Sequence, residues 1–302
     1  MKIGIIGGGA VGLLFGAYFG TEYDVTIYTR SSKQAEKINE QGLQLSKQGN
    51  FSNIPLKANA NFAKMEAQNL IIVAVKQYDL ESLLPILKKI SANIPLLFIQ
   101  NGMGHLQKID QLADFTTIYI GTVEHGVQRL TERSIIHTGI GKTNIGIFRG
   151  GIDQLTLFPH VADKHFPVYM QADSIDMLQR KLIANALINP LTAVFNVKNG
   201  HLLNNPFYYR VFTKLYTEIS ILFPELHKSG IMNEVESICA STKDNTSSML
   251  KDIKEGRKTE IDAILGYIIE QGGMKGHSMP LSNMVYNMIK GMEIEGSSRG
   301  LC

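Results

Sequence analysis

The residues best suited to chemistry are a lysine and two asparagines that recur every four positions. Lys181, Asn185 and Asn189 stand immediately before Pro190. Because four residues advance an α-helix by about 400°, the three side chains drift by only about 80° and form one polar stripe on a helix that the proline should end. The apolar residues around them are Leu178, Leu182, Ile183, Ala186 and Leu187. We therefore predict a helix that docks by its apolar face and presents an ammonium and two amides to a polar cavity.

A solvated helix face is the alternative to this interpretation. Asparagine is a poor helix former, so two of them at regular helical spacing need a reason. The stripe therefore predicts that this face of the helix meets something polar.

The start of the chain carries a glycine motif in the setting that a dinucleotide site requires. Residues 1–6 form a short apolar pattern typical of a strand, and an apolar helical run extends over 13–19. The residues between them are Gly7, Gly8, Gly9, Ala10, Val11 and Gly12. This is G-x-G-x-x-G, whose glycines permit a tight turn, close approach of a pyrophosphate and close packing of helix on strand. The phosphates would bind at the positive helix N-terminus, and an ordinary glycine turn is the alternative.

The second expected strand indicates which dinucleotide binds. Residues 24–28 form that strand, and Thr29-Arg30-Ser31-Ser32-Lys33 follows at its carboxyl end, where an NAD enzyme usually has an acidic residue. A guanidinium pairs with a 2′-phosphate, whereas a carboxylate would repel it. We predict NADPH/NADP as the cofactor, with Arg30 as its ligand. The alternative is that Arg30 and Lys33 only cap a surface turn.

Composition excludes several other classes of protein. The 302 residues carry a net charge of +3 and 44% hydrophobic residues, which suits one large or two medium domains and gives no basic stripe for nucleic acid. The two cysteines, Cys239 and Cys302, are too few for a disulfide framework and lack metal-ligand spacing, so no metal is expected. The N-terminus lacks the features of a signal peptide, and no apolar run has the length of a membrane span. We therefore expect a cytoplasmic protein with no membrane partner.

The chain changes character once along its length. The expected strands are 1–6, 24–28, 70–75, 95–99, 117–121, 143–147 and 167–170. Only helical patterns follow, at 175–189, 207–228, 234–241, 246–255, 261–271 and 282–292. We predict an α/β fold with an N-terminal Rossmann-type dinucleotide-binding domain, residues 1–172, and a second, all-helical C-terminal domain, residues 173–302. The helical half is rich in methionine and could present an apolar dimer face, so a homodimer is one expectation.

Further polar residues lie where such a fold would bind ligands. Lys76 and Asn101 each follow an expected strand, and open α/β sheets bind ligands at the carboxyl ends of their strands. In the helical half, Asn245 or Ser247 could cap a helix that begins near Ser248. Each of these residues could instead have a purely structural role. Lys76 could only cap a helix, and Asn101 could only form a turn.

These segments together carry a family resemblance. They are Gly7-x-Gly9-x-x-Gly12, Val75-Lys76, Gln100-Asn101-Gly102, Lys181-x3-Asn185-x3-Asn189-Pro190-Leu191-Thr192-Ala193, Asn199-Gly200, Ser248-Met249-Leu250-x-Asp252 and Gly256-Arg257-x-Thr259-Glu260-Ile261-Asp262. In this order they resemble 2-dehydropantoate 2-reductase, also called ketopantoate reductase, from residue 1 into 276–280. The lysine-asparagine helix and the Thr-Glu-Ile-Asp segment are the specific parts. Met103 departs from the leucine that is commoner in the family.

The resemblance implies NADPH-dependent reduction of 2-dehydropantoate to (R)-pantoate, a step toward pantothenate and coenzyme A. It implies catalytic roles for Lys181, as general acid, and for Glu260, which would accept a hydrogen bond from the substrate hydroxyl. The implied substrate ligands are Asn101, Asn185, Asn189, Asn199, Asn245 and Ser248. Lys76 and Asn101 would also contact the cofactor. Two alternatives stay open: a related enzyme that reduces another branched 2-oxo acid, and a non-catalytic NADPH-sensing protein.

Overall fold

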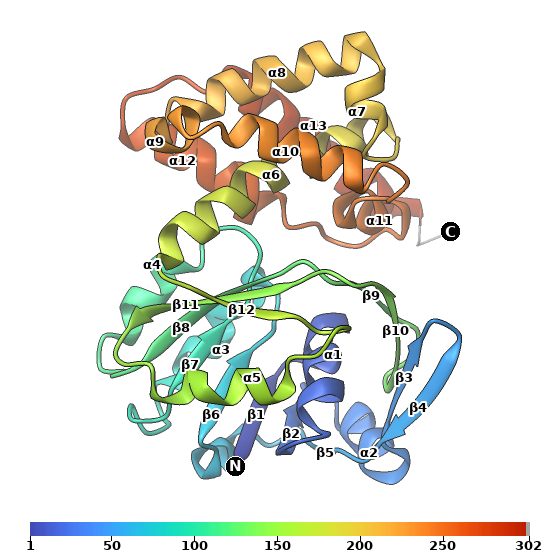
Figure 1. Ribbon diagram of the computed structural model, residues 1–302, viewed down its shortest axis with the longest axis vertical. Coiled ribbons are helices and arrows are strands. Elements are labelled where there is room, and N and C mark those ends of the chain that lie inside the picture. The colour runs from blue at the N-terminus through green and yellow to red at the C-terminus, as the bar shows by residue number, and fades with distance from the viewer. Residues whose placement is uncertain (300–302) are drawn as a thin grey trace. The chain divides into compact units, whose positions relative to one another are not determined.

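The computed structural model describes residues 1–299 and divides the chain into two compact units (Figure 1). The sheet unit comprises Met1–Gln100 and Leu106–Met177, and the helical unit comprises Asn101–His105 and the chain from Leu178 onward. Helix α6, Ser174–Phe195, begins in the first unit and continues into the second. The domain boundary predicted near residue 172 stays a prediction. A short segment after β7, Asn101–His105, belongs to the helical unit although the sequence on both sides of it belongs to the sheet unit.

The sheet unit is built on an eight-stranded sheet with the order β12-β11-β8-β7-β6-β1-β2-β5. Its strands are β1 Lys2–Ile6, β2 Asp24–Tyr28, β5 Lys57–Asn59, β6 Leu70–Val73, β7 Leu96–Phe98, β8 Ile118–Val123, β11 Thr143–Arg149 and β12 Val168–Gln171. From β5 to β8 all neighbours are parallel, and counted along the chain these six strands have the Rossmann order 3-2-1-4-5-6. The predicted strands are confirmed to within two residues.

Burial on both faces explains why these strands could be predicted from the sequence. Strands β6 and β7 are apolar at every position and buried at every position, as is typical of parallel strands covered on both faces. The order of the strands reverses between β1 and β6, so the carboxyl ends of these two neighbours form the switch point where open α/β sheets bind ligands. Gly7 follows β1 directly, and Lys76 follows β6 after two residues.

A second sheet of four strands was not predicted. It has the order β4-β3-β10-β9, with β3 Leu43–Lys47, β4 Asn50–Ile54, β9 Gly126–Arg129 and β10 Ser134–Gly139. These strands are short and partly polar, and four of the five residues of β4 are exposed, so they lack the apolar signal of the large sheet. The short strand β5 was missed for the same reason.

Helix α1, Ala10–Phe19, packs against strands of both sheets, which explains its apolar composition on every face. The remaining helices of this unit are α2 Ser32–Gln41, α3 Leu80–Leu87, α4 Leu106–Ile109 and α5 Phe158–Val161. Single 3₁₀ turns occupy Phe62–Ala67, Gln77–Asp79, Asp110–Leu112 and Asp153–Leu157. Phe15 and Phe19 of α1 pack edge-on against Phe166, with ring centroids 5.2 and 6.4 Å away.

The helical unit contains no strand within the part of the chain that the structure describes, as predicted. After α6 it continues with α7 His201–Asn204, α8 Pro206–Ser220, α9 Pro224–Lys228, α10 Ile231–Ser241, α11 Ser248–Lys254, a π-helical turn at Asp262–Gly266, α12 Tyr267–Met274 and α13 Pro280–Arg299. The helix predicted over 207–228 is interrupted before Pro224, which lies at the first position of α9 and cannot donate a backbone hydrogen bond to a continuing helix. In residues 1–299 no helix has both the length and the hydrophobicity to span a bilayer.

The prediction that α6 ends before Pro190 is wrong, because the helix continues to Phe195. A proline inside a helix costs about 3 kcal/mol. Here Pro190, Leu191, Thr192 and Ala193 are all buried, and burying apolar side chains offsets such a cost. The Thr192 hydroxyl also lies 2.7 Å from the carbonyl oxygen of Ile188 on the preceding turn. Tertiary packing therefore overrides the local signal of the proline.

Candidate active site

The polar stripe predicted on α6 is present in the structure. Between residues 181 and 193 every residue is buried except Lys181, Asn185 and Asn189, which are partly exposed. Only side chains that share the one stripe therefore reach the surface of this stretch of the helix, and all three are polar. The arrangement gives an ammonium and two amides on a buried, mostly apolar support.

A hydrogen bond between two hydroxyl groups ties α6 to the start of α11. Thr192 Oγ1 lies 2.7 Å from Ser247 Oγ, and Ser247 Oγ also accepts a bond from the backbone N–H of Leu250. Ser247 is therefore the helix cap, and the alternative that Asn245 serves as the cap is excluded. Ser248 is the first residue of α11, and both it and Asn245 are exposed.

Asn199 occupies a different environment from the other predicted ligands. Its side chain is only 7% exposed, and its amide Nδ2 donates to Thr242 Oγ1 at 2.9 Å. Its backbone N–H donates to the carbonyl oxygen of Asn245 at 3.1 Å. These bonds link the start of α7 with the loop after α10. These bonds support a structural role for Asn199, and its assignment as a substrate ligand stays a prediction.

Glu260 and Asn101, two further predicted site residues, are joined by a side-chain hydrogen bond in the helical unit. Asn101 Nδ2 donates to Glu260 Oε2 at 2.8 Å, and the glutamate is almost completely buried. Asn101 lies three residues after β7, in the short segment that belongs to the helical unit. This bond fixes the direction of a buried carboxylate.

Gly102 explains how the segment after β7 comes so close to Glu260. Its φ is +78°, and a Cβ at this position would lie 2.1 Å from the carbonyl oxygen of Ala263, in the π-helical turn. Both the backbone conformation and the close approach therefore require glycine. Three residues later in the same segment, burial lowers the pKa of His105 to about 4, so this imidazole is neutral at physiological pH.

In the sheet unit, the glycine motif forms a cradle for an anion. Gly7 has a φ of +119°, and a Cβ on Gly12 would lie 2.0 Å from the carbonyl oxygen of Gly7. Gly9 is the N-cap of α1, no side chain caps the helix, and a Cβ on Gly9 would meet no atom within 4 Å. The first turn of α1 has no acidic residue. Uncapped N–H groups beside open space, with no carboxylate to repel an anion, fit the pyrophosphate of a dinucleotide.

Arg129 is a residue of this cradle that the sequence did not reveal. Its Nη1 donates to the carbonyl oxygen of Gly8 at 3.0 Å, and Gln34 Nε2 donates to the same oxygen at 2.8 Å. Arg129 ends β9, in the small sheet that was missed. Its guanidinium places a further positive charge beside the glycine motif.

Arg30 lies after β2 as predicted, and it already has a partner. Its Nη1 lies 3.0 Å from Asp79 Oδ1, and 78% of its side chain is exposed. The predicted cofactor ligand Lys76 is the N-cap residue of the 3₁₀ turn that contains Asp79. Gln100 supports the backbone just before it, because Gln100 Nε2 donates to the carbonyl oxygens of Val73 and Val75 at 2.8 and 3.0 Å.

The two units thus hold different chemistry. The helical unit holds an ammonium, two amides and a fixed carboxylate, which suit a small ligand with hydroxyl, carbonyl and carboxylate groups. The sheet unit holds a Rossmann sheet with an anion cradle and a basic residue after β2, which suit a dinucleotide. Among the residues described, no three His, Cys, Asp or Glu side chains are grouped as a metal site would require.

Comparison with known proteins identifies the family. The family described as "Ketopantoate reductase PanE/ApbA" matches residues 3–150, and the family described as "Ketopantoate reductase PanE/ApbA C terminal" matches residues 173–293. The chain belongs to the ketopantoate reductase family. It is 38% identical over 297 residues to the 2-dehydropantoate 2-reductase of Listeria monocytogenes, a match that covers 98% of each chain. It is 37% identical over 298 residues to that of Bacillus subtilis, covering 97% of this chain and 98% of the relative.

Solved structures of family members have the same fold. A crystal structure described as a probable 2-dehydropantoate 2-reductase from Bacillus subtilis superposes with a TM-score of 0.88 at 36% identity, covering 97% of this chain and 100% of that one. A ternary structure of D-mandelate dehydrogenase superposes with a TM-score of 0.87 at 22% identity, covering 98% and 99% of the two chains. The ketopantoate reductase family thus shares this fold with a protein of another name.

The close approach of Gly102 yields a first prediction. Gly102→Ala should displace the segment that carries Asn101, because the methyl group would overlap a carbonyl oxygen and because a residue with a Cβ is strained at this φ. We expect a loss of about 1–3 kcal/mol in the free energy of unfolding, measured by urea denaturation. Gly273→Ala is the matched control, since a Cβ there meets no atom within 4 Å. Equal stability of the two variants would contradict the packing of Gly102.

Proposed function

We propose that the protein reduces 2-dehydropantoate to (R)-pantoate with NADPH, a step toward pantothenate and coenzyme A. The observation that carries the proposal is the stripe on α6, where Lys181, Asn185 and Asn189 alone reach the surface of a buried stretch. Relatives 37–38% identical over almost the whole chain are named for this reaction, which supports the choice of substrate. The carboxylate, hydroxyl and ketone groups of 2-dehydropantoate match the ammonium and amides that the helical unit offers.

The residues of the helical unit would act on the ketone and on the groups beside it. When bound, NADPH supplies the hydride that reduces the ketone carbon. Negative charge then grows on the ketone oxygen, and the Lys181 ammonium stabilises this charge and donates the proton that completes the hydroxyl group. The lysine then regains a proton from solvent. Glu260 accepts a hydrogen bond from the substrate hydroxyl, and Asn101 holds this carboxylate in place.

The remaining polar residues of the helical unit would orient the substrate. Asn185 and Asn189 lie one and two turns beyond Lys181 on the same stripe, and we assign their amides to the carboxylate and hydroxyl groups of the substrate. Ser248 and Asn245 are exposed at the start of α11, which Ser247 ties to α6. We assign them as further ligands of the same groups.

The residues of the sheet unit would hold the cofactor. We assign the pyrophosphate to the glycine motif and the N-terminus of α1, supported by the open space at Gly9. We assign the nicotinamide end to Lys76, which follows the carboxyl end of β6. The cofactor contact expected of Asn101, which belongs to the helical unit, stays a prediction. We assign the 2′-phosphate to Arg30, which would exchange the Asp79 carboxylate for the phosphate. With a cofactor that lacks the 2′-phosphate, Arg30 would stay paired with Asp79.

The alternatives from the sequence are less well supported. A pure NADPH sensor has no need for a proton donor and a fixed carboxylate on the same unit, whereas Lys181 and Glu260 are both present. Reduction of another branched 2-oxo acid would use the same residues, and the fold does not distinguish the two substrates. A cytoplasmic location and a homodimer remain predictions from the sequence.

The role of Lys181 gives a direct prediction. Lys181→Ala should lower kcat for 2-dehydropantoate by about 10²–10⁴-fold, the usual range for loss of a general acid, and leave the Kd for NADPH nearly unchanged. Steady-state kinetics and fluorescence titration of NADPH measure the two quantities. Lys198→Ala, an exposed lysine just beyond α6, is the control and should keep wild-type turnover. Wild-type turnover of the Lys181 variant would reject the assignment.

Cofactor choice gives a prediction for both partners of the exposed ion pair. Arg30→Ala should weaken NADPH binding by about tenfold or more, because a charge-assisted bond to phosphate is lost, and should leave NADH binding unchanged. Asp79→Asn removes the competing carboxylate and should strengthen NADPH binding alone. Isothermal titration calorimetry with both cofactors tests this. An equal loss for NADPH and NADH in the Arg30 variant would show that Arg30 does not recognise the phosphate.

A further inference from the structure

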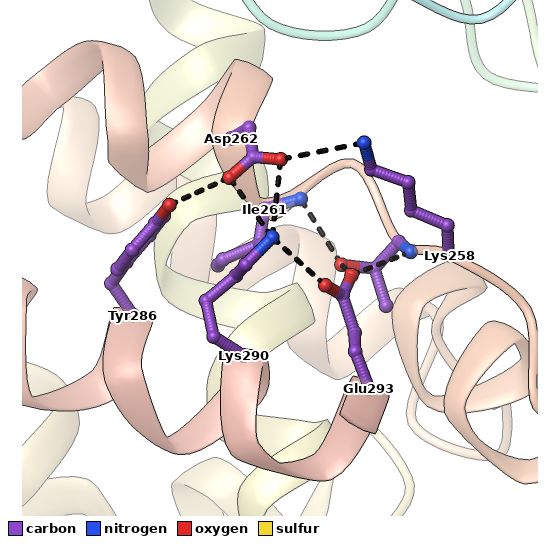
Figure 2. A network of polar contacts seen from close by, with 7 residues as sticks. Lys258, Ile261, Asp262, Tyr286, Lys290 and Glu293 are labelled. Carbon is purple, nitrogen blue, oxygen red and sulfur yellow. Dashed lines mark hydrogen bonds and ion pairs between the residues drawn. The ribbon is translucent and has the colours of Figure 1, made fainter. Parts of the chain in front are cut away.

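The turn that carries Glu260 is anchored to the C-terminal helix α13 by one carboxylate. Glu293 Oε1 accepts two hydrogen bonds from Thr259, from its backbone N–H at 2.7 Å and from its hydroxyl at 2.6 Å. Thr259 is buried, with 1% of its surface exposed, and Glu293 is partly exposed, with 10% of its side chain exposed. Figure 2 shows Glu293 reaching from α13 toward this turn. Hydrogen bonds to a charged acceptor are stronger than neutral ones, so these two bonds attach the turn firmly to α13.

The same network holds the residues on the other side of Glu260. Lys290 Nζ lies 3.0 Å from Glu293 Oε2 and 3.3 Å from Asp262 Oδ2 (Figure 2). Tyr286, one turn earlier on α13, donates its hydroxyl to Asp262 Oδ1 at 2.7 Å. The residues immediately before Glu260 and two positions after it are therefore both attached to α13.

A third contact closes the turn itself. The Thr259 hydroxyl oxygen accepts from the backbone N–H of Ile261 at 3.2 Å while its proton is directed to Glu293. The backbone of Glu260 thus lies inside a small ring of hydrogen bonds, and its side chain is fixed at the far end by Asn101. These bonds restrain both the backbone and the side chain of Glu260.

We infer that Glu293 is a positioning residue for the reaction: by binding Thr259 it sets the place of the Glu260 carboxylate relative to the substrate hydroxyl. This inference rests on the proposed function of Glu260. A catalytic group must be held to within about 0.5 Å to act well, and loss of its support lowers the rate although no contact with substrate is lost. Glu293 is 33 residues beyond Glu260 in the sequence, on a helix with no other assigned role.

The test is a set of variants in the full-length protein. Glu293→Ala should lower kcat/KM for 2-dehydropantoate by about tenfold or more, with the Kd for NADPH unchanged. Glu293→Gln keeps an oxygen that can accept from Thr259 and should recover most of the lost kcat/KM. Thr259→Ser keeps the hydroxyl and should behave like wild type, whereas Thr259→Val should resemble Glu293→Ala. Glu295→Ala, an exposed glutamate on the same helix, is the matched control.

A double-mutant cycle separates positioning from general destabilisation. In a Glu260→Ala background, Glu293→Ala should have no further effect on kcat/KM, because the group that it positions is gone. A loss of the same size in both backgrounds would overturn the inference, since Glu293 would then act through the fold as a whole. Wild-type kcat/KM in Glu293→Ala would overturn it as well.

A measurement independent of activity keeps this inference distinct from the proposed function. Hydrogen–deuterium exchange over residues 258–263 should be faster in Glu293→Ala than in wild type and in Glu295→Ala, because the Thr259 amide loses its acceptor. If the wild-type protein does not turn over 2-dehydropantoate, the proposed substrate is wrong. The role of Glu293 is then decided by the exchange result and by the double-mutant cycle repeated with the 2-oxo acid that the protein does reduce. Unchanged exchange would refute the attachment itself.

Discussion

The hydrogen bond between Asn101 and Glu260 is the contact on which the helical unit's site depends. It joins residues that are 159 positions apart, and it exists only because Gly102 lets the chain pass within contact distance of the carbonyl of Ala263. A nearly buried carboxylate is costly unless hydrogen bonds satisfy it, so the amide of Asn101 both stabilises Glu260 and directs it. The network on α13 fixes the backbone from which this carboxylate extends. Loss of the Asn101 amide, of Gly102 or of the α13 network would leave the Glu260 carboxylate present but displaced.

Helix α6 provides an apolar support for a few polar groups. Its buried residues exclude water from all but one stripe, and an ammonium at the edge of such a surface interacts more strongly with charge than it would in water. The sheet unit meets a different requirement by the same means. Its glycines remove side chains, so that backbone N–H groups at the start of α1 are open to an anion. In both units the functional groups are few, and the apolar residues around them determine where they lie.

Local features were predictable from the sequence, and features that depend on distant residues were not. The stripe of Lys181, Asn185 and Asn189 follows from helical period alone, and the buried parallel strands are continuous apolar runs. The small sheet was missed because its strands are short and partly polar, and with it Arg129 was missed. The continuation of α6 through Pro190 depends on burial by other helices. Glu293 and the Arg30–Asp79 pair are contacts across 34 and 49 residues, which no local pattern reports.

The central claim is that Lys181 and Glu260 serve the reduction of 2-dehydropantoate. The most direct measurement is oxidation of NADPH, followed by absorbance, by the purified protein with 2-dehydropantoate, beside pyruvate and a small panel of branched 2-oxo acids. The account predicts that kcat/KM is highest for 2-dehydropantoate and that (R)-pantoate accumulates in step with NADP. Absence of turnover with 2-dehydropantoate, while NADPH binds tightly, would contradict it.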